Sequence, residues 1–199
     1  MFGIRWRWIF IALVLFGAWQ LLGSSEVTAP PGSIAPKNPI QTTPSATQNY
    51  TMGGYSLKPL ANFNIEARVL SKESYSIGRE AELSPLDLAL GWGAMSDSSV
   101  LAKLSISQGG RFYYYRWENE PPIPPEQITM QSANMHLIPA NSDVKKKMHD
   151  VRVGQVVRLV GQLVEARASD GWYWRSSLTR EDTGAGACEL FRVESISVR

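Results

Sequence analysis

Cysteine and histidine are scarce in this chain of 199 residues. Cys188 is the only cysteine, and His136 and His149 are the only histidines. A single cysteine cannot form an intramolecular disulfide, and a lone one is most often a small buried side chain. A zinc site needs three or four such ligands at characteristic spacings, which the sequence lacks. We therefore expect no metal site and no cofactor.

An excess of charge of either sign is also missing. The formal net charge is +2, and the region from Tyr55 onward holds 17 Lys/Arg and 17 Asp/Glu. Nucleic-acid-binding domains usually carry a basic face and a high pI. The only basic run, Lys145-Lys146-Lys147, fits a solvated helix face. The charge pattern therefore disfavours nucleic acid as a partner.

The longest apolar stretch follows a short basic start. Arg5 and Arg7 precede residues 8–23, which contain no charged residue. Because arginines beside an apolar segment stay in the cytoplasm, the rest of the chain is expected to be exported. We predict that residues 1–23 form a signal-anchor transmembrane helix. The protein would then be a single-pass protein of a bacterial inner membrane, with a cytoplasmic N-terminus and a periplasmic domain.

A cleaved secretory signal is the alternative. The apolar run is long for a signal peptide and short for a spanning helix. Gly23-Ser24-Ser25 offers small residues for cleavage, and a cut near Ser25 would release a secreted domain. No cysteine follows the run, which excludes a lipoprotein signal.

Residues 24–54 are rich in proline and small polar residues. Such a composition buries too little apolar surface to offset chain entropy, so it predicts an extended, disordered linker. This linker would hold an exported globular domain, residues 55–199, several nanometres from the bilayer.

Alternating apolar and polar residues predict a mainly β domain. Strands are expected at 63–69, 105–108, 111–117, 136–138, 153–164, 172–175 and 188–198. Gly109-Gly110 supplies the positive φ that a tight hairpin turn needs, and Asp170-Gly171 predicts a type I′ hairpin turn. Gly161, in the middle of the longest strand, indicates a bend.

Short helices are predicted between these strands, at 86–90, 98–104, 125–132 and 143–149. Ser84-Pro85 and Ser96-Asp97 supply start signals for the first two, and Asn141-Ser142 supplies one for the last. The predicted fold class is α+β and mainly β. It is a small bent-sheet or barrel domain with short helical inserts, preceded by an N-terminal transmembrane helix.

Several stretches resemble known folds or families. Residues 151–166, VRVGQVVRLVGQLVEA, resemble the long bent first strand of OB-fold or SH3-like barrels. Residues 87–93, 132–139 and 176–182 resemble an uncharacterised family of bacterial membrane-anchored exported proteins. That family carries no assigned activity, so the resemblance implies a discrete bacterial domain and gives no catalytic residues.

A nucleophile can be assembled around Cys188. Residues 184–187 are Gly-Ala-Gly-Ala, and their N–H groups could face an oxyanion. His136 or His149 could act as the base. Against this, Cys188 begins a predicted strand among small residues, as a packed core cysteine would.

A binding surface can be assembled from aromatic and charged residues. Trp172 and Trp174 lie on the same face of one predicted strand, beside Arg175. Exposed, they would form an aromatic platform for a ligand or partner, although we expect at least one to be buried. Arg180 lies in a polar loop, and Trp92 between two glycines is a further candidate contact.

The anchor, the linker and the absence of a recognisable catalytic constellation favour a non-catalytic envelope protein. Its periplasmic β-domain would bind a protein partner or an envelope component in an accessory or assembly role. An envelope hydrolase that uses Cys188 with a histidine is one alternative. An OB-like binder of oligosaccharide or nucleic acid is another.

Overall fold

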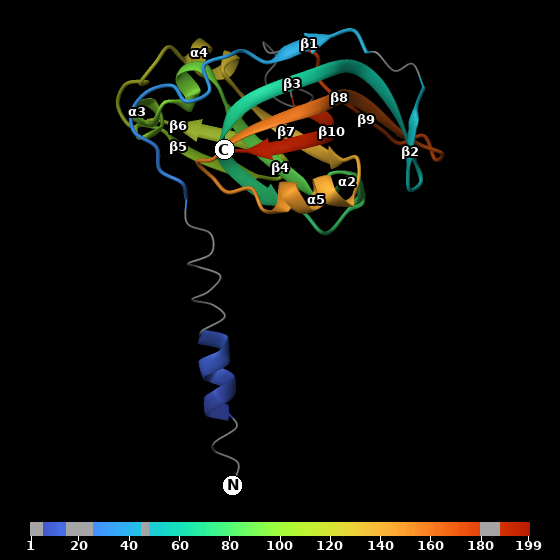
Figure 1. Cartoon of the computed structure of the whole chain (residues 1–199), viewed down its shortest axis with the longest axis horizontal. Coiled ribbons are helices and arrows are strands. Elements are labelled where there is room, and N and C mark those ends of the chain that lie inside the picture. The colour runs from blue at the N-terminus through green and yellow to red at the C-terminus, as the bar shows by residue number, and fades with distance from the viewer. Residues whose placement is uncertain (1–5, 15–25, 45–47, 180–187) are drawn as a thin grey trace.

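The computed structural model of the chain describes residues 6–14, 26–44, 48–179 and 188–199. Residues 6–14 are helical, and the other described residues form a β-rich domain (Figure 1). No helix within the described part of the chain is long and apolar enough to cross a membrane. Much of the predicted anchor, residues 1–5 and 15–23, lies outside the described residues.

The strands alternate with short helices along the chain. The strands are β1 (Ile40–Thr42), β2 (Tyr50–Met52), β3 (Tyr55–Ser74), β4 (Leu86–Gly91), β5 (Ser105–Gly109), β6 (Phe112–Arg116), β7 (Ser132–Pro139), β8 (Val156–Ala168), β9 (Tyr173–Arg175) and β10 (Glu189–Val198). The helices are α2 (Arg79–Leu83), the 3-10 turn η1 (Gly93–Ser96), α3 (Ser98–Leu101), α4 (Pro125–Met130) and α5 (Ser142–His149).

The long strand β3 organises the main sheet. Its first part, from Tyr55 to Arg68, pairs with β8, and its last part, from Arg68 to Ser74, pairs with β4. β4 pairs with β7, β7 runs parallel to β10, and β10 pairs with β8. Each of these five strands therefore has a partner on both sides. The prediction of a mainly β domain built on a bent sheet is confirmed.

Gly161 of β8 lies opposite Val193 of β10, where the two strands pair. A Cβ atom at this position would lie 2.0 Å from the backbone oxygen of Arg192. The register between the two strands shifts just beyond this point, between Val193 and Ser195. The glycine that we expected to mark a bend thus permits a close backbone approach, because no side chain intervenes.

The core lies on the inner face of the bent sheet. Alternate residues of five strands meet there, including Phe63, Leu88, Leu137, Leu159 and Phe191. Helix α5 covers one end of this core with Val144 and Met148. Its start was predicted correctly, because the Asn141 side chain accepts a hydrogen bond from the Val144 N–H at 2.9 Å.

The β5–β6 hairpin forms a separate two-stranded sheet. One face packs against a second apolar cluster through Tyr113, Tyr115 and Trp117. Phe112 and Tyr114 alternate with them and are exposed. The aromatic residues of this hairpin therefore divide between a packed face and an exposed face.

The helix predicted at 86–90 is wrong, because this segment is strand β4. Leu86, Leu88 and Leu90 alternate along it and all point into the core. This period of two fits a strand, and it outweighs the helix-start signal of Ser84-Pro85.

Both hairpin turns differ in detail from the turns that the sequence predicts. Gly109 pairs with Phe112, so the central turn residues are Gly110 and Arg111, with φ of 59° and 72°. Positive φ at both positions is the signature of a type I′ turn. At the second turn only Gly171 has positive φ, whereas Asp170 does not, so that turn is not type I′.

The described parts of residues 24–54 also differ from the predicted disordered linker. Ser33 forms a bridge with Asp97, and its hydroxyl donates to the Gly93 oxygen at 2.6 Å. Ala35 is fully buried, and β1 and β2 both pair with β3. Composition underestimates order here because backbone hydrogen bonds to the domain satisfy a segment that has little apolar surface of its own.

Candidate functional site

A groove of about 750 Å³ lies over the outer face of β7. We call it the β7 groove. One wall is the tip of the β5–β6 hairpin, and the other is the segment from β9 to residue 178. It is lined by Glu80, Arg111, Phe112, His136, Tyr173, Trp174, Arg175, Ser176, Ser177, Leu178 and Cys188. A larger hollow of about 960 Å³ beside Trp117 has only exposed residues as its charged and amide lining, so it presents no fixed polar group.

Two polar residues lie beneath this groove because of strand register. Asp87 of β4 is directly opposite His136 of β7, and both point away from the core. Asp87 is fully buried and His136 is 3% exposed. Their facing atoms, Oδ2 of Asp87 and Nδ1 of His136, are 2.9 Å apart. The carboxylate therefore lies against the imidazole ring within ion-pair distance, but the two atoms do not have the geometry of a hydrogen bond.

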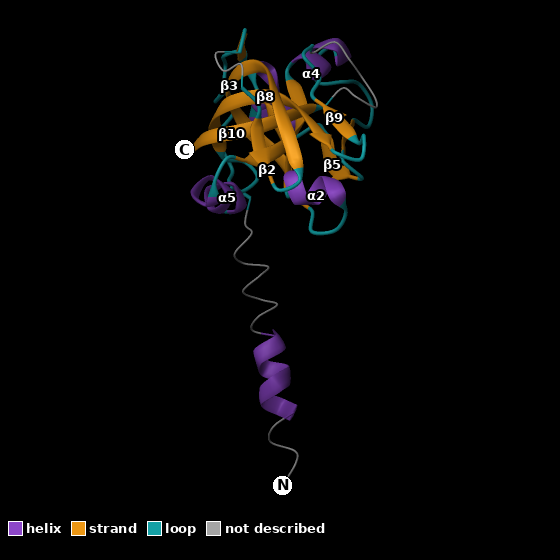
Figure 2. Cartoon of the chain, turned by 90° about the vertical axis from the view of Figure 1, so that its right-hand side faces the viewer, coloured by secondary structure: helices purple, strands orange, loops and turns teal. Residues whose placement is uncertain are grey.

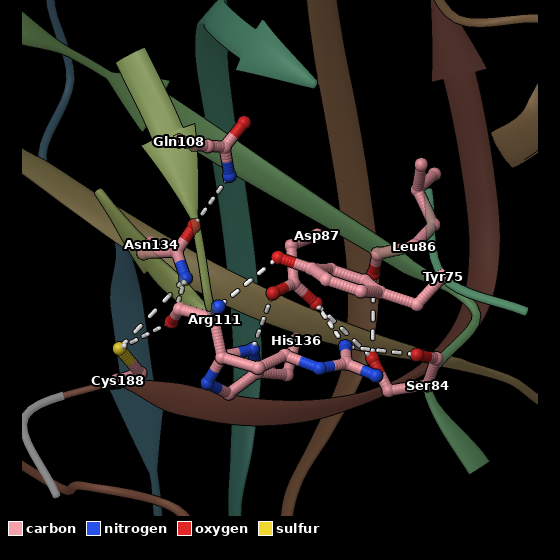
Figure 3. A network of polar contacts seen from close by, with 9 residues as sticks. All are labelled: Tyr75, Ser84, Leu86, Asp87, Gln108, Arg111, Asn134, His136 and Cys188. Carbon is pink, nitrogen blue, oxygen red and sulfur yellow. Dashed lines mark hydrogen bonds and ion pairs between the residues drawn. The ribbon is translucent and has the colours of Figure 1, made fainter. Parts of the chain in front are cut away.

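Arg111 connects the hairpin tip to this pair (Figure 3). Its Nη1 donates to Oδ1 of Asp87 at 2.7 Å and to the Ser84 oxygen at 2.9 Å. The guanidinium lies over the Tyr75 ring at 3.7 Å from its centroid. A left-handed conformation costs a non-glycine residue about 1–2 kcal/mol, so these contacts must offset it. Arg111 thus holds one wall of the groove in place.

Asn134 and Cys188 complete the polar network on this side (Figure 3). The Asn134 amide donates to the Arg111 oxygen at 2.9 Å and lies 3.8 Å from the Cys188 sulfur. The Cys188 thiol donates in turn to the Arg111 oxygen at 3.8 Å. Burial raises the pKa of the Cys188 thiol to about 11. The thiol is therefore protonated at neutral pH and acts as a hydrogen-bond donor.

Aromatic rings form the opposite wall. Tyr173 is 62% exposed, and the half-buried Trp174 ring lies 4.8 Å from the His136 ring. Phe112 faces the groove from the hairpin and is 39% exposed. Trp172 packs instead against Tyr55, at 5.5 Å between ring centroids. As predicted, Trp172 and Trp174 share a face, but both are half-buried and only Trp174 lines the groove.

The two arginines of the groove are already paired with carboxylates. Arg111 binds Asp87, and Arg175 binds the buried Glu165 at 2.7 Å. Arg167 contacts the other oxygen of Glu165 at 2.6 Å. The hydrogen bond from Arg175, with that from Arg167, lowers the pKa of Glu165 despite its burial. The groove therefore combines aromatic rings with compensated charges.

The remaining candidates do not meet at this site. Trp92 is 1% exposed and belongs to the core. The prediction that it is a surface contact is therefore wrong. Trp92 follows β4 directly, where the chain turns over the end of the core. His149 is exposed on α5, with Nδ1 3.7 Å from Asp150. Arg180 lies outside the described residues.

Sequence reasoning missed Asp87, Arg111 and Asn134. Asp87 was hidden inside a predicted helix, although the alternation of the leucines around it would have placed it on the outer face of a strand. Arg111 directly follows two glycines in a hairpin, and no local pattern shows that its side chain is buried. Asn134 adjoins a predicted strand, and its contacts depend on the hairpin docking.

Within the described residues, no group of three or more His, Cys, Asp or Glu could hold a metal ion. Comparison with known proteins finds no matching family model, no matching curated protein and no matching solved structure.

Proposed function

We propose that this chain is a non-catalytic binding protein of the bacterial cell envelope. Its N-terminal segment would attach it to the inner membrane, and its β7 groove would bind a neutral oligosaccharide of the envelope. The observation that carries this proposal is the position of an aromatic-lined groove over the outer face of β7, in a sheet whose strands pair in a particular order.

The order in which the strands pair supports an OB-type assignment. The order β3-β4-β7-β10-β8, with β7 parallel to β10, matches OB-fold strands in the order 1-2-3-5-4. Helix α5, between β7 and β8, matches the helix that closes an OB core. OB-folds bind oligosaccharides and oligonucleotides on the face of strands 2 and 3, between the loops 1–2 and 4–5. The β7 groove has this location, with Glu80 from the first loop and residues 173–178 from the second.

The chemistry of the groove favours a neutral sugar. Exposed aromatic rings such as Tyr173 provide flat apolar surfaces with a polar edge, which suit the faces of sugar rings. Both arginines already pair with carboxylates, which weakens their attraction for a phosphate group. Nucleic acid would also need clustered Lys/Arg, which the neutral charge balance does not supply.

The test is calorimetric titration of the full chain with a hexamer of β-1,4-linked N-acetylglucosamine. We expect binding that Tyr173→Ala weakens about tenfold, because the variant loses the exposed stacking surface. Val198→Ala, at an exposed apolar residue near the end of β10 that does not line the groove, should leave the affinity unchanged. Absence of binding, or equal losses in the two variants, would contradict the proposal.

A thiol hydrolase is the second candidate, because Cys188 and His136 line the same groove and Asp87 lies 2.9 Å from the histidine. Such an enzyme needs a thiolate nucleophile. Burial acts against this by raising the pKa of Cys188 to about 11. We expect iodoacetamide to label Cys188 slowly at neutral pH, and fast labelling that is lost in His136→Gln would favour the hydrolase instead.

A further inference from the structure

We infer that one side of the domain rests on an anionic lipid bilayer. This side, called the α5 face, consists of α5, the following residues 150–155 and the loop 75–78 between β3 and α2. The inference rests on the proposed membrane attachment of the N-terminal segment, and the experiment below separates the two.

The described chain enters the domain at the α5 face. The backbone N–H of Val27 donates to the Val153 oxygen at 2.9 Å. A Cβ atom at Gly154 would lie 1.9 Å from the Val27 oxygen, so the two backbones are in close contact. The chain is therefore attached to the domain from Val27 onward. Only residues 24–26 then lie between the predicted anchor, residues 1–23, and the domain, a much shorter connection than the tether predicted from the sequence.

Basic side chains gather beside this entry point. Lys145, Lys146 and Lys147 on α5 are all exposed, as is Arg152 in the loop that follows. Residues 142–155 hold four Lys/Arg against the two acidic residues Asp143 and Asp150. Basic clusters close to a membrane anchor are attracted to anionic lipid headgroups.

An exposed apolar side chain lies on the same side. Ile77, in the loop between β3 and α2, is 91% exposed. Lys72, near the end of β3, donates to the Val151 oxygen at 2.9 Å and so joins this end of β3 to the end of α5. Figures 1 and 2 share a vertical axis, and both place α5, this loop and the start of the described segment at residue 26 on the lower side of the domain. An exposed apolar side chain on the same side of a domain as a basic cluster fits the headgroup region of a bilayer.

The test uses the full chain in lipid nanodiscs of phosphatidylcholine, with and without phosphatidylglycerol. Amide hydrogen exchange of α5 and of the loop 75–78 should slow in the anionic discs. The triple substitution Lys145→Glu/Lys146→Glu/Lys147→Glu should abolish this slowing, since each lysine strengthens surface association roughly fivefold. High salt should abolish it as well. Ile77→Asp should weaken the slowing in the loop.

The matched control is Lys37→Glu/Lys58→Glu/Lys103→Glu, which changes the total charge equally at exposed sites on other segments. This control should retain the slowing. Equal exchange of α5 in both lipids, or equal losses in the two triple variants, would overturn the inference. Co-elution of the wild-type chain with neutral discs reports the N-terminal attachment by itself. Attachment without lipid-dependent slowing would thus refute the α5 face alone, and slowing without attachment to neutral discs would refute the anchor alone.

Discussion

Arg111 is the residue on which the candidate site most depends. It adopts a left-handed conformation, which is unusual for a side chain of its size, with φ of 72°. In return its guanidinium pairs with the fully buried Asp87, and its backbone oxygen accepts from Asn134. The strain and the buried contacts together attach the hairpin to the sheet.

Replacement of Arg111 by Ala should lower the free energy of unfolding by about 3 kcal/mol, because it leaves the buried carboxylate of Asp87 without its cation. Urea denaturation measures this change. Arg116→Ala removes an exposed arginine from the same hairpin and should cost less than about 0.5 kcal/mol. Similar losses in the two variants would show that Arg111 does not anchor the hairpin.

Glu165 gives the domain a predictable response to acid. Its pKa is lowered by Arg175 and Arg167, so it binds a proton more readily in the unfolded chain than in the folded one. The stabilisation is complete above the unfolded pKa of about 4.3 and is lost as the pH falls through the lower folded value. Glu165→Gln should cost about 1 kcal/mol at pH 7, because both arginines are at least half exposed.

Urea midpoints measured between neutral pH and about pH 3 test this expectation. The stability of Glu165→Gln should fall less steeply with acid than that of the wild type, so the two curves should converge. Parallel curves would mean that Glu165 does not contribute through its ionised form.

At the scale of elements, the close pairing of β8 and β10 leaves no room for a side chain at Gly161. Gly161→Ala should destabilise the domain by more than about 2 kcal/mol, because its Cβ would overlap backbone atoms that cannot move independently. Gly109→Ala is the matched control, since a Cβ there meets nothing within 4 Å. It should be neutral or slightly stabilising. Thermal unfolding of both variants tests this expectation. Equal melting temperatures would contradict the close approach of the two backbones at Gly161.

Some elements could be predicted from the sequence and others could not. Alternation identified the long strands and the Asn141 cap identified α5, because these signals are local. The alternating leucines of β4 indicate a strand, but the helix-start signal of Ser84-Pro85 led us to predict a helix there. Strand partners, such as β7 with β10, depend on contacts across the whole domain, so no local pattern contains them.

The candidate site shows the same division. Trp174 and Arg175 were predicted as binding residues, and both line the groove. His136 and Cys188 were predicted for nucleophilic chemistry, and they also line it. Asp87 and Arg111 meet only because β4 and the hairpin pack against each other, which requires the tertiary structure.

At the scale of the whole molecule, the groove and the α5 face lie close along the chain. Glu80 lines the groove, and Ile77 of the same connection belongs to the α5 face. In our account the domain would therefore hold its ligand near the membrane surface, without a long tether between them.

The most direct test of the central claim is a footprint of the ligand on the full chain. Amide hydrogen exchange would be compared with and without a saturating hexamer of β-1,4-linked N-acetylglucosamine. The account predicts slower exchange in residues 173–178 and at the hairpin tip around Arg111, with little change in α5. Protection confined to other surfaces, or no protection at all, would contradict the claim that the β7 groove is the binding site.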